Sequence, residues 1–377
     1  MTVCIGIDGR VLTDRYHGIG RVAYEWIREL SRMPDVRLVV FTGTGHTRRF
    51  DLGALAREPS VSVRPVPAGP VDVRQWWRWR RLLRSSGVQV MVYPYHLGAS
   101  PIAGTPSLAL VHDCIFEADP RFAPSPRVRL AYRLFTSLIV RTSAVATVSA
   151  ASGREVERWY GRRVPSGHVI PNGVDLDRRG TPDGRRRLRD EFGLEPGYVL
   201  HVGAQRPHKN VPVLVEAIAK VPETRLVLVG SADERFSDEV GAAITRHGVG
   251  DRVTRLSFVP EDLLGSLYAA AGMFAYPSLV EGFGLPVLEA MVADTPVLAA
   301  DVPVLREVGG DAAQYVTPES ATAWAAAIAG LHTDAELRSR LVAAGAAHAA
   351  QFTWCAAAAR LAGACGALAK DYRAAAR

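Results

Sequence analysis

Short apolar segments rich in β-branched residues recur along the chain, and longer stretches with helical periodicity separate them. Gly, Pro, Asp or Ser bound each segment, as is typical of strands. In the first half the expected strands are Val3–Asp8, Arg37–Phe41, Val61–Val66, Val88–Tyr93, Ser107–Val111, Ala144–Val148 and His168–Ile170. Strands that alternate with helices predict a parallel sheet with helices on both faces.

A second series of such segments begins after residue 190. Its expected strands are Tyr198–Val202, Arg225–Gly230, Val253–Phe258, Met273–Tyr276, Pro296–Ala299 and Ala313–Val316. Between the two series, residues 172–190 are polar and rich in arginine, which is typical of a linker. The pattern predicts an α/β protein with two doubly wound, Rossmann-like domains, 1–171 and 191–352, whose ligand-binding strand ends face each other across a cleft. No strand follows the helical tail, 353–377, and we expect it to dock elsewhere, with the first domain as one candidate.

The composition changes this picture little. The 377 residues are 48% hydrophobic and carry a formal net charge of +7, with no low-complexity tract, which excludes disordered and fibrous classes. The first residues, MTVCIGIDGR, show no secretory signal, and no apolar stretch free of charged residues reaches the length of a membrane span. These features indicate a cytoplasmic protein. Only Lys209, Lys220 and Lys370 among the 45 basic residues are lysines, so the position of each lysine is informative.

The most informative segment follows the expected strand that ends at Tyr276. A glycine-rich loop leads to Pro286, which suits the first helical position because its φ is fixed and it has no N–H. The amides of Gly284 and Leu285 then lie at a helix N-terminus, where a phosphate or diphosphate binds well. Glu281 and Glu289 flank this anion site and suit the recognition of hydroxyl groups. The alternative is an ordinary glycine-rich turn before an acidic helix.

This segment, Glu281-GFGLPVL-Glu289, resembles the signature of the retaining glycosyltransferases of family 4, which have the GT-B fold. The resemblance covers essentially the whole chain. It implies that Glu281 contacts the transferred sugar and that Glu289 contacts the nucleotide ribose. It also implies that the loop between them holds the diphosphate, through Gly282, Phe283, Gly284 and Leu285.

Two segments of the first domain match the family in the expected order. Gly18-Ile-Gly20 follows the first strand, and its glycines would let the backbone approach a ligand closely. The resemblance implies that this loop faces the donor and the acceptor, although an ordinary strand–helix turn is the alternative. His112, at the end of a strand, corresponds to the family's histidine near the donor sugar. A structural histidine is the alternative there.

One of the three lysines lies where the family binds the diphosphate. Lys209 follows the first strand of the second domain and stands where a helix is expected to begin, as a compact cation with three donors. The resemblance implies that it contacts the diphosphate. The sequence departs from the commonest family pattern at Ala204, where an arginine usually follows the glycine. Arg206 or His208 is a candidate for the missing cation.

Other nucleotide-binding and metal motifs are absent from the sequence. It contains no Walker-type phosphate loop, and neither Gly43-Thr-Gly45 nor Gly282-Phe-Gly284 continues into a complete dinucleotide fingerprint. Asp175-Leu-Asp177 has the spacing of a metal-binding pair, but it falls in the expected linker. We therefore expect no metal and no separate cofactor.

The segment from Arg74 to Arg84, RQWWRWRRLLR, differs chemically from the rest of the chain. On a helix, Trp76, Trp79, Leu82 and Leu83 share one arc, while five arginines and Trp77 share the other. The structural interpretation is a surface helix that packs its apolar arc on the first domain. The alternative is a contact with an anionic membrane, at the inner face, or with an anionic acceptor. No nucleic-acid recognition motif accompanies the charge.

Taken with the resemblance, the sequence implies a retaining, metal-independent transferase that moves a sugar from a nucleotide-diphosphate donor to an acceptor hydroxyl. His112, Lys209 and Glu281 are the expected catalytic residues. A sugar-nucleotide epimerase of the same fold is one alternative, and a non-catalytic protein that binds sugar nucleotides is another. The sequence does not show which nucleobase and sugar the donor carries, or which acceptor is used.

Overall fold

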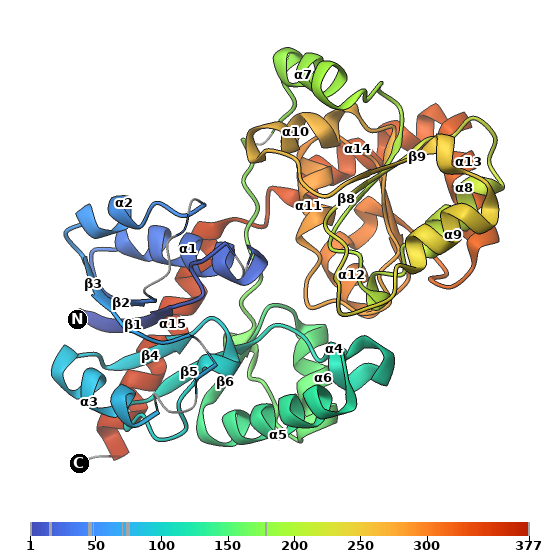
Figure 1. The fold of residues 1–377 in the computed structure, drawn as a ribbon. Coiled ribbons are helices and arrows are strands. Elements are labelled where there is room, and N and C mark those ends of the chain that lie inside the picture. Colours follow the sequence, from blue (N-terminus) through green and yellow to red (C-terminus); the bar gives the residue numbers. More distant parts are fainter. Residues whose placement is uncertain are drawn as a thin grey trace. The chain divides into compact units, whose positions relative to one another are not determined.

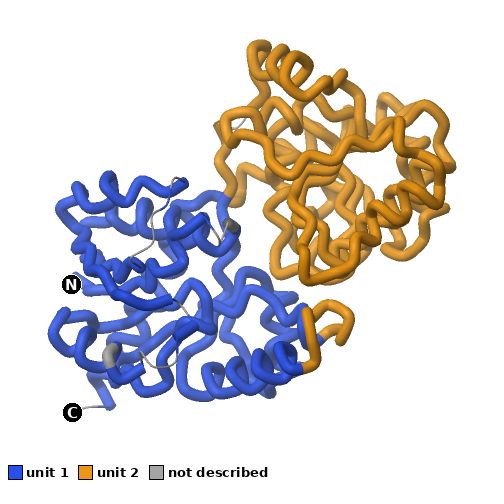
Figure 2. The backbone as a smooth tube through the Cα atoms, viewed as in Figure 1, with its two compact units in different colours: residues 1–117, 127–173, 353–377 blue, residues 118–126, 174–352 orange. Residues whose placement is uncertain are grey.

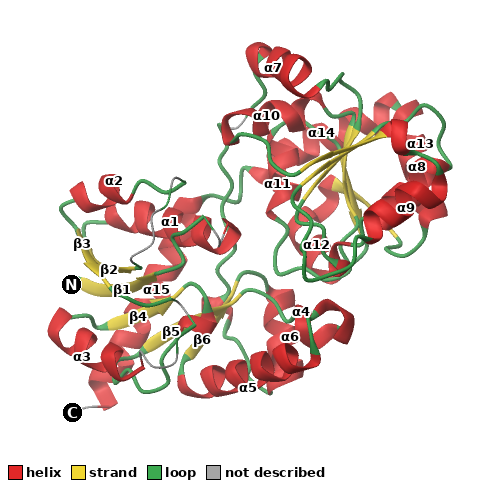
Figure 3. Ribbon diagram, viewed as in Figure 1, coloured by secondary structure: helices red, strands yellow, loops and turns green. Residues whose placement is uncertain are grey.

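The computed structural model describes residues 2–14, 17–43, 47, 49–69, 71–72, 76–177 and 179–375. The chain divides into two compact units (Figure 2). Unit 1 comprises residues 1–117, 127–173 and 353–377, and unit 2 comprises residues 118–126 and 174–352. Each unit is an α/β layer structure built on one parallel sheet (Figures 1 and 3).

The sheet of unit 1 has six strands in the order β3-β2-β1-β4-β5-β6, all parallel. The strands are β1 (Val3–Gly9), β2 (Val36–Thr42), β3 (Val61–Pro65), β4 (Val90–Tyr93), β5 (Ser107–Val111) and β6 (Ala144–Thr147). Its helices are α1 (His17–Ser31), α2 (Leu52–Arg57), α3 (Trp76–Ser86), α4 (Ile115–Ala118), α5 (Pro126–Thr142), α6 (Ala150–Tyr160) and α15 (Trp354–Ala375). Ser149 caps α6, as its position after a strand suggests, because its side chain accepts a hydrogen bond from the Ser152 amide at 3.0 Å.

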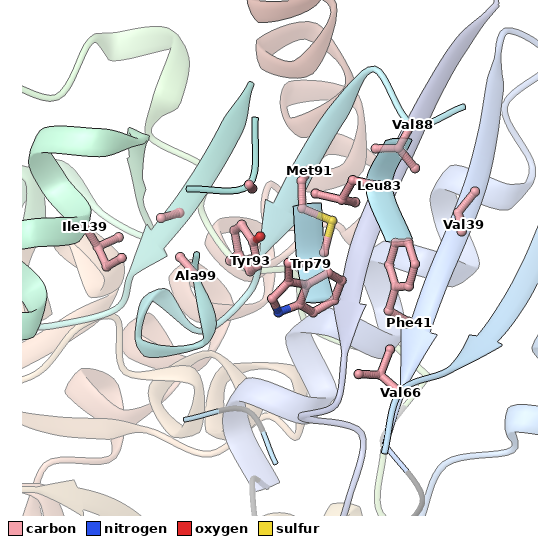
Figure 4. Close-up of a cluster of buried hydrophobic side chains, with 12 residues drawn as sticks. Val39, Phe41, Val66, Trp79, Leu83, Val88, Met91, Tyr93, Ala99 and Ile139 are labelled. Atoms are coloured by element: carbon pink, nitrogen blue, oxygen red, sulfur yellow. The ribbon is translucent and has the colours of Figure 1, made fainter. Parts of the chain in front are cut away.

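A dense aromatic and aliphatic core lies between the sheet of unit 1 and two of its helices (Figure 4). Helix α3 contributes Trp79 and Leu83, and α5 contributes Ile139. Trp79 packs edge-on against Phe41 of β2 and Tyr93 of β4, with ring centroids 5.0 and 6.0 Å apart. The helices α3 and α5 therefore cover the same face of the sheet.

The sheet of unit 2 also has six parallel strands, in the order β12-β11-β10-β7-β8-β9. The strands are β7 (Val199–Val202), β8 (Leu226–Val229), β9 (Val253–Leu256), β10 (Met273–Tyr276), β11 (Val297–Ala300) and β12 (Ala313–Val316). Its helices are α7 (Pro182–Phe192), α8 (Pro212–Ala219), α9 (Glu239–His247), α10 (Glu261–Ala270), α11 (Leu285–Val292), α12 (Pro303–Gly309), α13 (Ala321–Thr333) and α14 (Ala335–Ala349). The chain leaves β7 toward β8 and leaves β10 toward β11, in opposite directions, so the loops after these two neighbouring strands separate and form the switch point of the sheet.

Two expectations about the elements differ from the structure. The segment His168–Ile170 is no strand: a 3-10 turn spans Ser166–His168, and only an isolated bridge joins Val169 to Thr147. The expected linker, 172–190, contains most of helix α7. Thr181 caps this helix and Gly193 ends it in a left-handed conformation, so the polar, arginine-rich composition belongs to a surface helix.

The C-terminal helix α15 belongs to unit 1, where it packs against α1, β1 and β4. Within the described residues, one stretch, Ala335–Ala375, satisfies the length and hydropathy requirements of a membrane span, with a mean hydropathy of 1.3 in its most apolar window. The stretch comprises α14 and α15, which belong to different units. Leu341 of α14 and Leu361 and Cys365 of α15 are buried in the cores of those units. Buried core helices meet the same requirements, so this result is a weak indication of a membrane span.

Candidate functional site

The switch point of unit 2 brings together the two loops that carry the motifs. One loop follows β7 and contains a 3-10 turn, η5 (Pro207–Lys209); the other follows β10 and leads into α11. The amide of Leu279 donates to the carbonyl of His208 at 2.8 Å, which joins the loops directly. A Cβ at Gly230, after β8, would lie 2.2 Å from the Gly203 carbonyl oxygen, so the backbone after β7 and β8 is too close for any side chain.

Lys209 and Glu281 meet between these loops. The Nζ of Lys209 donates to Glu281 Oε1 at 2.5 Å and to the hydroxyl of Tyr276 at 2.9 Å. The side chains of Lys209 and Glu281 are only 14% and 9% exposed. Two residues 72 positions apart thus form a nearly buried ion pair at the carboxyl end of the sheet.

The pKa values of this cluster reflect burial and mutual attraction. Burial alone would lower the pKa of Lys209, but Glu281 and Tyr276 outweigh it and raise the pKa above its ordinary value. Burial raises the pKa of Glu281, and the Lys209 ammonium reverses this effect and lowers it. Burial raises the pKa of the Tyr276 phenol, with Glu281 adding to the rise. Near neutral pH, the site therefore holds an ammonium, a carboxylate and a neutral phenol.

Helix α11 begins beside this pair. Gly284 caps it with φ of 101°, a conformation that favours glycine, and a Cβ there would lie 2.8 Å from Leu305 Cδ2. Leu285 is the first helical residue and Pro286 the second, one position later than the sequence predicts. The N-terminus of α11 carries the partial positive charge of its first amides.

Phe283 and Gly282 lie in the loop before α11, and both are buried. The ring of Phe283 packs edge-on against Phe352, with centroids 6.0 Å apart. The Phe283 side chain therefore fixes the loop from inside unit 2, and the backbone of the loop is the part suited to a ligand.

Glu289 lies one turn into α11 and is partly exposed. The hydroxyl of Tyr268, on α10, donates to Glu289 Oε2 at 2.9 Å. Tyr268 is buried, so it fixes one oxygen of the carboxylate from the protein side.

The two candidates for a second cation have other surroundings. Arg206 is exposed and pairs with Asp233 at 2.9 Å. His208 is buried against Phe122, with ring centroids 5.9 Å apart, and burial followed by the Lys209 charge lowers its pKa to about 3. His208 is therefore neutral at physiological pH, and Lys209 is the cation at the centre of the loop.

The site residues expected in unit 1 lie in two places, after strand β5 and in helix α1. His112 follows β5, and its Nε2 donates to the carbonyl of Pro94, after β4, at 2.8 Å. Burial lowers the pKa of His112 to about 4, so the ring is neutral and Nδ1 carries its lone pair. Gly18 and Gly20 lie in the first turn of α1 and not in a loop. Gly18 is exposed, whereas a Cβ at Gly20 would lie 2.9 Å from Phe50 and from the Val11 carbonyl.

Comparison with known families accounts for both units. Residues 16–178 match the profile of "Glycosyltransferase Family 4", and residues 185–348 match that of "Glycosyl transferases group 1". The chain belongs to the family 4 glycosyltransferases.

Curated relatives resemble the chain in part. O-antigen chain mannosyltransferase B of Escherichia coli is 32% identical over 251 residues, which cover 64% of this chain and 65% of the relative. A D-inositol 3-phosphate glycosyltransferase of Nocardia farcinica is 34% identical over 230 residues, covering 58% of this chain and 51% of the relative. The chain thus spans between half and two thirds of the length of these relatives.

Solved structures share the family 4 fold over the whole chain. Sucrose-phosphate synthase from Thermosynechococcus elongatus has a TM-score of 0.76 at 21% identity and covers 100% of both chains. Anabaena HepE in complex with UDP-glucose has a TM-score of 0.74 at 20% identity, covering 97% of this chain and 100% of HepE. Together with the two parallel sheets, these neighbours show the GT-B fold.

Sequence reasoning missed several residues of this candidate site. Tyr276 and Tyr268 contact Lys209 and Glu289 through their hydroxyls, but each is read from sequence as an apolar core position. His201 on β7 is buried and stacks on Tyr276 with ring centroids 5.7 Å apart. The signal that could have found these residues is their placement on strands and helices beside the two motif loops.

Unit 1 has its own switch point, between β1 and β4, and a buried ion pair that the sequence did not reveal. Asp8, on β1, accepts hydrogen bonds from the Arg10 guanidinium at 2.7 Å, and both side chains are almost fully buried. Arg10 also donates to the carbonyls of Gly69 and Gly98 at 2.9 Å and stacks on Trp79 at 4.7 Å. Arg10 thus connects the loops after β3 and β4 to helix α3.

Helix α3 is the tryptophan- and arginine-rich segment. Its apolar arc faces inward as predicted, because Trp79 and Leu83 are buried, while Trp77 is exposed. Arg74 lies outside the described residues.

Proposed function

We propose that the protein is a retaining, metal-independent glycosyltransferase that moves a sugar from a nucleotide-diphosphate donor to an acceptor hydroxyl. The observation that carries the proposal is the Lys209–Glu281 pair at the switch point of unit 2, beside the N-terminus of α11. Ligands of doubly wound sheets bind at such switch points, and diphosphates bind at helix N-termini.

The charges of the pair suit the two halves of the donor. The ammonium of Lys209 binds a diphosphate oxygen, and Glu281, freed from the lysine, accepts hydrogen bonds from hydroxyls of the transferred sugar. Glu289 accepts hydrogen bonds from the ribose hydroxyls. The Tyr268 hydroxyl holds the Glu289 carboxylate in place by donating a hydrogen bond to its Oε2. Because Ala204 has no charge and Arg206 is paired with Asp233, Lys209 carries the cationic part of this recognition.

The reaction balances without a protein nucleophile. The bond between the anomeric carbon and the diphosphate oxygen breaks, and the acceptor oxygen bonds to that carbon on the same face. The acceptor proton moves to the leaving diphosphate, whose developing charge Lys209 and the amides of α11 stabilise. His112 serves as a neutral hydrogen-bonding group toward the donor sugar, in keeping with its lowered pKa.

The names of the relatives suggest which substrates to test first. They include mannosyltransferases that act on O-antigen chains and glycosyltransferases named for D-inositol 3-phosphate, and HepE is bound to UDP-glucose. A thermal-shift panel of UDP-, GDP-, ADP- and dTDP-sugars would identify the donor, because a ligand at 100 times its Kd stabilises the folded protein by about 2.7 kcal/mol.

The anomeric configuration of the product tests the proposal. With the donor from the panel, proton NMR of the product should show the configuration that the sugar had in the donor. Inversion of configuration would contradict the retaining mechanism. An isomerised sugar nucleotide formed without acceptor would indicate an epimerase, and tight donor binding without hydrolysis or transfer would indicate a binding protein.

We also propose that the protein is cytoplasmic and that α3 contacts an anionic partner, either an anionic acceptor or the inner membrane face. The exposed Trp77 and the arginines of α3 support the contact with an anionic partner. It is independent of the donor site, which lies in unit 2.

A further inference from the structure

The outward face of α3 is unusually cationic. Trp77 is 72% exposed, and it lines a shallow hollow of about 500 Å³ together with Arg80, Arg81, Arg84 and Ser85. Within the described part of the chain, none of these three arginines forms a hydrogen bond or an ion pair. Their guanidinium groups are therefore available to an external anion.

Helix α5 has an exposed apolar stripe. Leu130 and Leu134 are 60% and 64% exposed, and Leu138 continues the row at the next turn. The opposite side of the helix, with Thr136, Ile139 and Val140, is buried. Solvent-exposed leucines at i, i+4 and i+8 form a continuous stripe on one side of a helix.

The two helices are neighbours on one face of unit 1. Trp76 of α3 packs on Phe135 of α5 with ring centroids 5.6 Å apart, and both helices contribute to the same core cluster. In Figure 1 they lie along the same side of unit 1. Of the nine large hydrophobic side chains that are exposed in the described ranges, five belong to these two helices, and the remaining four are scattered.

The charges of both helices have one sign. Each helix contains four arginines and neither contains an aspartate or a glutamate. Helix α7 of unit 2 is also rich in arginine, but its Arg186 and Arg187 pair with Asp183 and Glu191. Neither α3 nor α5 therefore carries an acid of its own to neutralise its arginines, although Arg129 and Arg133 of α5 lie near the buried Glu117 of α4.

We propose that the outward faces of α3 and α5 together form a membrane-docking surface for anionic lipids. The arginines bind lipid phosphates, Trp77 suits the headgroup region, and the leucine stripe enters the boundary of the acyl chains. A second copy of this chain is a poor occupant, because a symmetric contact would bring like charges together. The surface extends the α3 contact proposed above to α5, and for the α3 half it rests on that proposal.

Binding to vesicles tests the docking surface without donor or acceptor. The probe is a vesicle of equal parts phosphatidylglycerol and phosphatidylcholine, compared with a vesicle of phosphatidylcholine alone, in cosedimentation at low salt. The wild-type chain should sediment with the anionic vesicles only. Because no sugar nucleotide is present, the result is independent of whether the transfer reaction proposed for unit 2 is correct.

Three variants separate the two helices from non-specific charge. Replacing Arg80, Arg81 and Arg84 with Gln should lower the partition coefficient about 100-fold, because each arginine contributes about fivefold. Leu130→Gln with Leu134→Gln should lower it about 10-fold without lowering the melting temperature, because both side chains are mostly exposed. The matched control replaces Arg185, Arg186 and Arg189 of α7 with Gln, the same charge change on another helix, and should keep most of the binding.

Four outcomes would overturn the proposal. The wild-type chain could fail to sediment with anionic vesicles. The α7 control could also lose as much vesicle binding as the α3 variant. The leucine variant could bind the vesicles as well as wild type, which would limit the contact to the arginines of α3 and exclude α5 from the surface. Finally, light scattering could find a dimer that the leucine variant dissociates, which would make a second copy the occupant.

Discussion

The Nζ of Lys209 lies 2.5 Å from Oε1 of Glu281, although the two residues belong to loops that follow different strands. The pair holds the cation and the carboxylate in a nearly buried position before any ligand arrives. A diphosphate that takes the ammonium must release the carboxylate, and a sugar hydroxyl can then bind it. The ion pair therefore couples recognition of the two halves of the proposed donor.

Lys209→Ala should lower kcat/KM for transfer by about 10- to 150-fold, the equivalent of one charge-assisted hydrogen bond of about 1.5–3 kcal/mol. Steady-state kinetics with the identified donor would measure this. The matched control is Lys220→Ala, because Lys220 is half exposed in the same unit and, among the described residues, forms an ion pair with Glu216 at 3.5 Å.

Lys209→Ala also leaves Glu281 buried without its cation, which destabilises the fold. The double variant Lys209→Ala with Glu281→Gln removes both charges and should restore the melting temperature without restoring transfer. Wild-type kcat/KM in the single variant would remove Lys209 from the diphosphate site.

Glu289 and Glu281 should differ in what they bind. Glu289→Ala is expected to weaken nucleotide diphosphate binding, measured calorimetrically without sugar, and Glu281→Ala to slow transfer with a smaller effect on that affinity. Tyr268→Phe removes the hydroxyl that holds Glu289 Oε2 and should reproduce a part of the Glu289→Ala loss. Equal losses of nucleotide affinity in both glutamate variants would show that the division of roles is wrong.

Transfer should continue in EDTA. In the proposed reaction, the ammonium of Lys209 and the N-terminus of α11 stabilise the charge of the leaving group, which is the role of a divalent ion in a metal-dependent transfer. Initial rates with and without the chelator check this. Complete loss of activity that magnesium or manganese restores would contradict a metal-free reaction.

His201 should make the fold less stable in acid. Burial, with a smaller effect of Lys209, lowers its pKa from 6.5 to about 4, and its Nδ1 is occupied by the Ala275 carbonyl at 3.1 Å. Between these values the unfolded chain binds a proton that the folded chain does not, so the free energy of unfolding falls as pH falls. The contribution is about 2 kcal/mol between pH 7 and pH 5.

Urea denaturation of wild type and His201→Gln at pH 7 and pH 5 measures this effect. The variant should lose less stability on acidification than wild type, by about the same 2 kcal/mol. An equal loss in both proteins would show that His201 does not carry the acid sensitivity.

Hydrophobic periodicity was sufficient to predict all twelve strands of the described residues, because buried parallel strands are continuous apolar runs. It failed at His168–Ile170. This segment is as apolar as a strand, but it is joined to β6 only by an isolated bridge and does not form a ladder of strand hydrogen bonds. It also failed for α7, because a surface helix held mainly by caps and by Gly184 against Ser266 has the polar composition of a linker.

The candidate site was predictable only as far as local motifs reach. Glu281, Glu289 and Lys209 stand in recognisable loops, and the structure brings the first and the last together. The pairing itself, and the hydroxyls of Tyr268 and Tyr276 that fix the charged groups, depend on strand order and helix packing. No spacing along the chain reveals these long-range contacts.

Helix α15 has a consequence for the order of folding during synthesis. Unit 1 contains both early strands and this last helix, whereas every residue of unit 2 lies between them in sequence. On the ribosome, unit 2 can form its complete core while unit 1 still lacks the helix that packs on α1, β1 and β4. The unfinished unit 1 therefore exposes that apolar face until Trp354 and the residues after it emerge.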